Sequence, residues 1–279
     1  MDTFDIGGEL TVGRIGLGAM RITGEDVIGE PDDPDGAREV LRRAAELVDL
    51  IDTADSYGPG VSERLIGETL APYDDVAVAT KGGLLRNREG EWLPRGDPDH
   101  LRNAVLCSLD RLRTDRIDLY QLHTPDPDVD FEASVTALAE LKDDGVVEHL
   151  GLSNVDVEQL DLARDHVEVA TVQNRYNVAF REEAAVLDAC EQYGIGFIPW
   201  YPLAAGELGS VEGLTDVAEA HDTTVQDVAL AWLLERSPVT LPIPGTASVE
   251  HLEANVAAAD LELTDAEVAR LRSFIIIRE

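Results

Sequence analysis

Lysine is almost absent from this chain, and basic residues as a whole are few. The 279 residues include 22 lysines and arginines against 56 aspartates and glutamates, a formal net charge of −34 at pH 7. Nucleic acid is therefore disfavoured as a partner, because phosphate binding requires a basic face. Of the lysines, Lys142 lies beside two aspartates, where a solvated role explains it, whereas Lys81 ends an apolar run. A functional role is therefore more plausible for Lys81 than for Lys142.

Cysteine and long hydrophobic runs are scarce as well. Cys107 and Cys190 fall in separate helix-like segments without metal-ligand spacing, so we predict no metal site and two buried thiols in a reducing compartment. No apolar run is long enough to cross a membrane, and the first residues lack the features of a signal peptide. We therefore expect a cytoplasmic protein with no membrane partner, as a monomer or weak oligomer.

The excess of acidic residues has a consequence for solution conditions. A folded protein of this charge repels itself in dilute buffer, whereas molar salt shortens the screening length to about 3 Å and relieves the repulsion. We predict a halophilic source and loss of structure in low salt. Disorder is excluded by the periodic patterns and by the 44% of hydrophobic residues. At this length we expect one domain, residues 1–279.

Apolar runs and helical stripes alternate along the chain, which predicts an α/β fold. Gly7-Gly8 marks the turn of an N-terminal β-hairpin, and Thr264 to Glu267 reads as a capping box for the last helix. Residues 84–96 read as a polar loop. Eight strand–helix units in this length indicate a (β/α)8 TIM barrel with an N-terminal β-hairpin. The strands are predicted at residues 14–20, 50–53, 76–80, 117–122, 146–152, 169–173, 195–200 and 239–243.

A doubly wound sheet is the alternative architecture for such an alternation. It normally carries a Gly-x-Gly-x-x-Gly turn between its first strand and helix, followed by an acidic residue about 20 positions later. No such turn is present, and the glycines between Gly13 and Gly18 lie within the first predicted strand. The barrel is therefore the favoured architecture.

Four polar residues follow successive predicted strands. Asp52 ends the second and Tyr57 follows it, while Lys81 and His123 follow the third and fourth. In a barrel these strand ends converge at one mouth. An ammonium near the phenol of Tyr57 favours phenolate, which lowers the pKa and eases proton donation. Asp52 could hold Lys81, and His123 could bind a carbonyl, so the set suits carbonyl reduction by a cofactor hydride.

Each of the four residues has a structural explanation when taken alone. Tyr57 could be a rim aromatic, Lys81 a strand-end charge and His123 a hydrogen-bonded loop residue, because most polar strand-end residues serve structure. Asp52 could cap the next helix. Their occurrence on three successive strand ends favours the catalytic interpretation. No nucleophile elbow of the type Gly-x-Ser-x-Gly and no histidine metal motif competes with it.

Three segments carrying these residues resemble signatures of the aldo-keto reductase family. They are Ile51-Asp52-Thr53-Ala54 with Tyr57-Gly58, then Ala79-Thr80-Lys81, then Leu119 to Asp126 around His123. The resemblance extends from about Gly7 to Asn255. It implies that Tyr57 is the proton donor, that Lys81 and Asp52 tune it, and that His123 orients the carbonyl.

The resemblance also implies a nicotinamide cofactor and its binding residues. The first strand and the fifth to seventh strand ends would surround the nicotinamide, with an aromatic ring at position 200 stacked on it. The last loop and the short helix after it would hold the adenine end. The residues implied are Gly18, Ala19, Met20, Ser153, Asn154, Gln173, Trp200, Tyr201, Leu203, Ile243, Gly245, Thr246, His251 and Asn255.

The last loop departs from the family pattern. Members that prefer the 2′-phosphorylated cofactor place lysine or arginine there, whereas this chain has Gly245, Ala247 and His251. A 2′-phosphate would lose charge-assisted hydrogen bonds of about 1.5–3 kcal/mol each. NADP(H) is the family default, and the loop composition argues for NAD(H) or for use of both.

The substrate is expected to be a small-molecule carbonyl or alcohol, with Trp92 as a candidate substrate contact or as a packing residue. Two other functions stay open. One is a sugar or polyol dehydrogenase that uses the same residues in the oxidative direction. The other is a non-catalytic cofactor-sensing protein on the same fold, like the β subunits of potassium channels, since a fold does not determine function.

Overall fold

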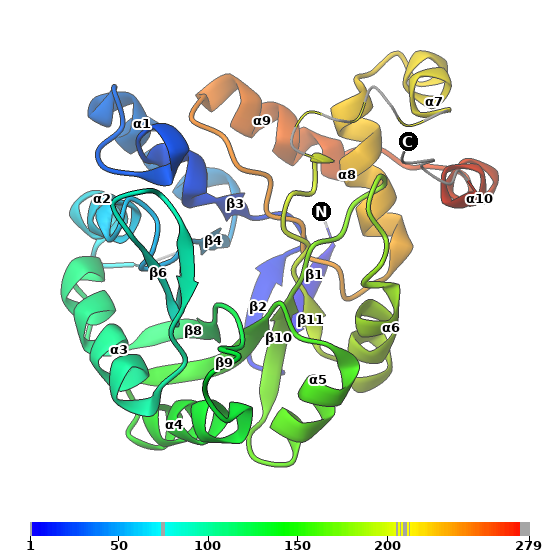
Figure 1. Ribbon diagram of the computed structural model, residues 1–279. Coiled ribbons are helices and arrows are strands. Elements are labelled where there is room, and N and C mark those ends of the chain that lie inside the picture. Colours follow the sequence, from blue (N-terminus) through cyan, green and yellow to red (C-terminus); the bar gives the residue numbers. More distant parts are fainter. Residues whose placement is uncertain are drawn as a thin grey trace.

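A curled parallel sheet forms the centre of the protein, and helices surround it (Figure 1). The computed structural model describes residues 2–73, 76–204, 206, 208, 211 and 213–273. Within them the sheet has seven strands in the order β11-β10-β9-β8-β5-β4-β3. The strands are adjacent in chain order and are separated by helices, as a (β/α)8 barrel requires. The predicted fold class is confirmed.

The strands of the protein are short and belong to one parallel sheet and two hairpins. Two antiparallel hairpins, β1–β2 and β6–β7, accompany the parallel sheet. The strands are β1 (Thr3–Ile6), β2 (Leu10–Gly13), β3 (Leu17–Gly18), β4 (Leu50–Asp52), β5 (Ala77–Gly82), β6 (Leu84–Arg86), β7 (Trp92–Pro94), β8 (Ile117–Leu122), β9 (Val147–Ser153), β10 (Val169–Gln173) and β11 (Gly196–Phe197).

Aspartate side chains begin several of the helices, which accounts for part of the acidic composition. Asp33, Asp97, Asp130 and Asp156 each accept a hydrogen bond from a backbone N–H in the first turn. The helices are α1 (Pro34–Leu47), α2 (Val61–Leu70), α3 (Pro98–Leu112), α4 (Phe131–Asp143), α5 (Val157–Arg164), α6 (Ala184–Tyr193), α7 (Leu214–Ala220), α8 (Val225–Arg236), α9 (Val249–Ala257) and α10 (Asp265–Ser273), with 3₁₀ turns η1 (Ala19–Ile22), η2 (Glu25–Val27) and η4 (Ala258–Asp260).

The barrel is closed by an irregular segment in place of the predicted eighth strand. Leu241 N donates to Phe197 O at 2.8 Å on one side of residues 239–245. On the other side, Gly16 N donates to Pro242 O at 3.0 Å and Gly18 N to Pro244 O at 3.3 Å. The prediction of a strand at 239–243 is wrong because prolines at 242 and 244 have no N–H for a regular ladder.

The hairpin β1–β2 lies across the barrel, as Figure 1 shows near its centre. Its apolar side chains Ile6 and Val12 are fully buried and pack with inward-facing residues of the strands, including Leu50, Leu119 and Ile198. A second and larger apolar cluster fills the space between strands and helices. The two clusters together form the apolar core of the described residues.

Other sequence predictions need correction. The first strand is shorter than predicted, because residues 19–22 turn into η1 directly after Gly18. The predicted loop at 84–96 contains the hairpin β6–β7, whose strands are too short and exposed to give a clear alternation. Cys190 is buried as predicted, but Cys107 is exposed, because it lies off the apolar stripe of α3.

The capping box predicted for the last helix is present. Glu267 N donates to Thr264 Oγ1 at 3.3 Å, and Thr264 N donates to Glu267 Oε2 at 2.8 Å. Among the described residues, every helix is too short or too polar to traverse a lipid bilayer.

Candidate active site

The four predicted catalytic residues lie at the C-terminal ends of adjacent strands. Asp52 is the last residue of β4, Lys81 lies near the end of β5, and His123 follows β8. Tyr57 comes from the turn before α2, where its backbone N–H donates to Ala54 O at 3.2 Å. All four are buried, with Tyr57 and His123 only 8% and 7% exposed. The strand order β8-β5-β4 brings together residues that are 71 positions apart in sequence (52 to 123).

Lys81 and Asp52 form a buried ion pair. Lys81 Nζ lies 2.6 Å from Asp52 Oδ1 and also donates to Thr53 O at 2.8 Å. Gln121 and Gln173 donate to the second carboxylate oxygen, Oδ2, at 3.2 and 2.9 Å. Burial lowers the pKa of Lys81, but the charge of Asp52 opposes it, and the net shift is upward. The ammonium therefore stays charged behind the phenol.

The phenol of Tyr57 lies in front of this pair. Lys81 Nζ is 5.3 Å from the centroid of the Tyr57 ring. Burial raises the pKa of Tyr57, and Lys81 lowers it by charge and hydrogen bonding, with a net upward shift. The net lowering predicted from the neighbouring ammonium is not found, because desolvation of the phenolate outweighs the charge of Lys81. Tyr57 is consequently a protonated phenol at neutral pH.

His123 is a neutral imidazole packed edge-on against Tyr57. Their ring centroids are 5.9 Å apart, with an interplanar angle of 81°. Burial, and then the charge of Lys81, hold the pKa of His123 well below its usual value. Its Nδ1 lies 3.3 Å from the hydroxyl oxygen of buried Ser56. A neutral imidazole can donate one hydrogen bond, which is what a carbonyl oxygen accepts.

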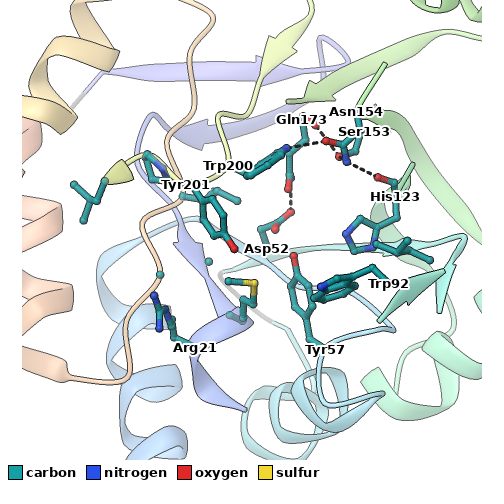
Figure 2. Close-up of a pocket in the computed structure, with 18 residues that line it drawn as sticks. Arg21, Asp52, Tyr57, Trp92, His123, Ser153, Asn154, Gln173, Trp200 and Tyr201 are labelled. Carbon is teal, nitrogen blue, oxygen red and sulfur yellow. Dashed lines mark hydrogen bonds between the residues drawn. The ribbon is translucent and has the colours of Figure 1, made fainter. Parts of the chain in front are cut away.

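A pocket of about 300 Å³ opens in front of Tyr57 and His123. Figure 2 shows Tyr57, His123 and Trp92 together on one side, with Trp200 and Tyr201 across the pocket. Trp92, which is 41% exposed, stands edge-on to Tyr57 with ring centroids 6.5 Å apart. The lining residues are Gly18, Ala19, Met20, Arg21, Asp52, Tyr57, Leu84, Trp92, His123, Ser153, Asn154, Gln173, Trp200, Tyr201, Pro202, Leu203, Ile243 and Gly245.

A hydrogen-bonded group borders the pocket beside Trp200 (Figure 2). Trp200 Nε1 donates to Asn154 Oδ1 at 3.0 Å, and Asn154 Nδ2 donates to His123 O at 2.9 Å. Ser153 Oγ donates to Gln173 O at 2.7 Å. An indole face held in place beside hydroxyl and amide groups offers both stacking and hydrogen bonding to a flat ring with a carboxamide. These residues fit a nicotinamide.

Most of the predicted cofactor residues line this pocket, but three do not. Thr246 and Asn255 are buried at 5% and 7% exposure, and His251 is exposed on α9; none borders the pocket. Three lining residues were not predicted from the sequence: Arg21 and Pro202, which adjoin predicted residues, and Leu84, which lies in the hairpin β6–β7. Arg21 directly follows predicted Met20 and could have been found by extending that segment.

Comparisons with known proteins agree with this geometry. The model of the aldo/keto reductase family matches residues 14–276. The chain is 42% identical over 279 residues to pyridoxine 4-dehydrogenase of Escherichia coli (strain K12), covering 97% of each chain. The glycerol dehydrogenase from Gluconobacter oxydans superposes with a TM-score of 0.89 at 28% identity, over 97% of this chain and 94% of that one. An aldo/keto reductase from Klebsiella pneumoniae in complex with NADP and acetate superposes with a TM-score of 0.79 at 28% identity. The superposition covers 96% of this chain and 93% of that one.

Proposed function

The chain belongs to the aldo/keto reductase family and is an NAD(P)-dependent oxidoreductase; on that premise we propose that Tyr57 protonates the carbonyl oxygen of a small aldehyde or ketone. The observation that carries this assignment is the buried pair of Lys81 and Asp52 directly behind the phenol, with their charged atoms 2.6 Å apart. The cofactor supplies the hydride. Lys81 keeps a positive charge near the phenol oxygen, where negative charge develops as the proton leaves.

His123 would bind the carbonyl oxygen of the substrate beside Tyr57. Its neutral imidazole donates a hydrogen bond without competing for the proton, since burial holds its pKa well below the usual value. The edge-on rings of Tyr57 and His123 then present two donors to one oxygen atom. A substrate held in this way has its carbonyl carbon facing the side of the pocket bordered by Trp200 and Asn154, which we assign to the nicotinamide.

The substrate class that we propose is an aromatic aldehyde, with pyridoxal as the first compound to test. Three aromatic side chains besides Tyr57 line the pocket, and Trp92 and Tyr201 stand at its exposed edge. Flat rings pack against such walls in offset or edge-on arrangements. Arg86 lies 3.8 Å above the Trp92 ring and holds it in place. The similarity to a pyridoxine 4-dehydrogenase favours a pyridine ring as the occupant.

Oxidation of an alcohol is a second candidate for the physiological direction. The same residues would serve, with Tyr57 accepting the proton. The names of two similar proteins favour it, since one is a pyridoxine dehydrogenase and the other a glycerol dehydrogenase. Rates measured in both directions at equal cofactor saturation would separate reduction from oxidation.

We also propose a cytoplasmic protein of a halophilic organism. The net charge of −34 supports the salt-rich setting. The free thiols of Cys107 and Cys190 support a reducing compartment. For the cofactor, the Klebsiella pneumoniae complex favours NADP, whereas the composition of the last loop favours NAD(H), so both are proposed for the assay.

The test of this function compares wild type with Tyr57→Phe by the absorbance of reduced nicotinamide, in about 2 M KCl to screen the surface. We expect turnover to fall by about 10²–10⁴ in the variant, because general acid catalysis is lost, while NADPH binding is retained. Tyr193→Phe is the control, since its hydroxyl contacts Asp161 on the surface. Unchanged turnover in Tyr57→Phe would contradict the mechanism. Cofactor binding by wild type without turnover of any carbonyl would favour the sensor function.

A further inference from the structure

Arg21 lies at the rim of the pocket on the side away from His123 (Figure 2). It belongs to η1, which follows β3 without a connecting loop. A Cβ built on Gly245 would lie 3.3 Å from Cγ of Arg21, so the arginine stem fills the space that a side chain at position 245 would take. The stem of Arg21 thus lies beside the last loop, although Arg21 itself belongs to η1.

Arg21 is one of the described arginines that have no carboxylate partner. Most arginines with described partners pair with carboxylates, as Arg102 does with Asp99 and Arg111 with Glu63. Within the described ranges, Arg21 has no ion pair and no side-chain hydrogen bond. Among the described residues that line the pocket, Arg21 is also the only lysine or arginine, since Lys81 lies behind the lining and is bound to Asp52. An exposed cation at the pocket rim is therefore available to an anion.

We propose that Arg21 binds a phosphate group of the nicotinamide dinucleotide, an inference that rests on the proposed function. With the nicotinamide beside Trp200, the rest of the cofactor has to leave the pocket along its rim. Residues Gly18 and Gly245 form a bridge between β3 and the last loop there, and Arg21 adjoins it. A planar guanidinium donates paired hydrogen bonds that match phosphate oxygens. Arg21 thereby supplies the positive charge that Gly245, Ala247 and His251 do not.

Two phosphate groups could be the ligand, and they differ between the cofactors. The pyrophosphate is common to NADH and NADPH, whereas the 2′-phosphate occurs only in NADPH. Recognition of the pyrophosphate would strengthen binding of both, and recognition of the 2′-phosphate would favour NADPH alone. In both cases one arginine binds a phosphate group. Titration with NADH and with NADPH shows whether that group is the pyrophosphate or the 2′-phosphate.

The experiment measures dissociation constants of NADPH and NADH by quenching of tryptophan fluorescence in wild type, Arg21→Gln and Arg21→Lys. All titrations use the lowest salt concentration at which circular dichroism shows each protein folded, because salt screens the contact. Arg42→Gln is the matched control, since Arg42 is exposed on α1 and outside the pocket. We expect Arg21→Gln to weaken binding about tenfold or more, from the loss of charge-assisted hydrogen bonds, and Arg21→Lys to recover part of the loss.

The outcomes separate this inference from the proposed function. Weaker binding of NADPH alone would identify the 2′-phosphate as the ligand, and equally weaker binding of both cofactors the pyrophosphate. If the dissociation constants of Arg21→Gln for both cofactors lie within twofold of those of Arg42→Gln, the assignment of Arg21 is overturned. The proposed enzyme function would be unaffected by that result. Wild type that binds neither cofactor would instead contradict the proposed function.

Discussion

The hydroxyl oxygen of Ser56 lies 3.3 Å from Nδ1 of His123, and both side chains are buried. Which ring nitrogen of a neutral histidine carries the proton depends on the hydrogen bond made by the other. A hydroxyl that donates to Nδ1 leaves the proton on Nε2, the nitrogen that would then donate to a carbonyl oxygen. A Ser56 that donates in this way would be a positioning residue for His123, although it is not itself among the residues that line the pocket.

Replacement of Ser56 by alanine should lower kcat/KM by roughly two- to tenfold, the effect of one neutral hydrogen bond of about 0.5–1.5 kcal/mol. Nitrogen-15 NMR of the imidazole should show a larger fraction of the other tautomer. Ser134→Ala is the control, because Ser134 is also buried but donates to Gly96 O outside the site. An unchanged tautomer ratio in Ser56→Ala would show that the serine does not orient the ring.

Breaking the pair of Lys81 and Asp52 should destabilise the protein strongly. Lys81→Met or Asp52→Asn leaves an uncompensated buried charge, which costs about 3–5 kcal/mol. The double variant should lose much less than the sum of the two, because neither charge remains. Urea denaturation of the four proteins measures the coupling free energy.

The other lysine provides a control for this cycle. Lys142 Nζ lies 3.5 Å from Glu168 on the surface, so Lys142→Met should change the free energy of unfolding by about 0–1 kcal/mol. Additive losses in the Lys81 and Asp52 variants would contradict the view that the two charges stabilise each other.

Through Asp55, stability should fall as the pH rises from about 4 to about 8. Burial, and then the charge of Glu63, raise the pKa of Asp55 to about 8, against about 3.9 in the unfolded chain. Because the folded-state value is raised, the contribution to stability is fully present below about pH 4 and is lost as the pH rises towards 8. Asp55→Asn does not titrate, so its Tm should decline less than that of wild type between about pH 5 and pH 9.

Thermal denaturation at several pH values checks this prediction. The exposed Asp128 supplies the control, since Asp128→Asn should follow the wild-type profile. Equal declines of Tm in wild type and Asp55→Asn would mean that Asp55 is ionised in the folded protein throughout this range.

Removal of salt should unfold the protein. The net charge of −34 acts across the whole surface, and at about 50 mM salt the screening length exceeds 10 Å, so that repulsion between separate carboxylates is no longer screened. Dialysis from about 2 M KCl should reduce the far-ultraviolet circular dichroism signal, with recovery on return to high salt. A spectrum that does not change on dialysis would contradict the proposed halophilic source.

The sequence allowed the barrel and the grouping of Asp52, Tyr57, Lys81 and His123 to be predicted, because strand ends in a parallel barrel converge whatever the loops do. Hydrophobic periodicity carries that information directly. It carries less about short and exposed elements, which is why the hairpin β6–β7 that presents Trp92 is not evident from the sequence. Prolines at positions 242 and 244 remove two N–H groups within and directly after the apolar run at 239–243, so hydrophobicity alone overstates its ability to form a strand.

The contacts of individual side chains were harder to predict. The position of Ser56 beside His123 depends on the turn geometry before α2, and that of Arg21 beside Gly245 depends on how the barrel closes. Both are long-range consequences of the fold. The direction of the pKa shift of Tyr57 also required the burial of the phenol, a quantity that no motif contains.

Barrel closure between β3 and residues 239–245 relies on hydrogen bonds from Gly16 and Gly18 to two proline carbonyls. A dinucleotide bound across Gly18 and Gly245 would contact both sides of this closure and hold them together. At a concentration one hundred times its dissociation constant, it would add about 2.7 kcal/mol to the free energy of unfolding. Depletion of the cofactor would remove this contribution, so the stability of the protein would depend on the cofactor concentration.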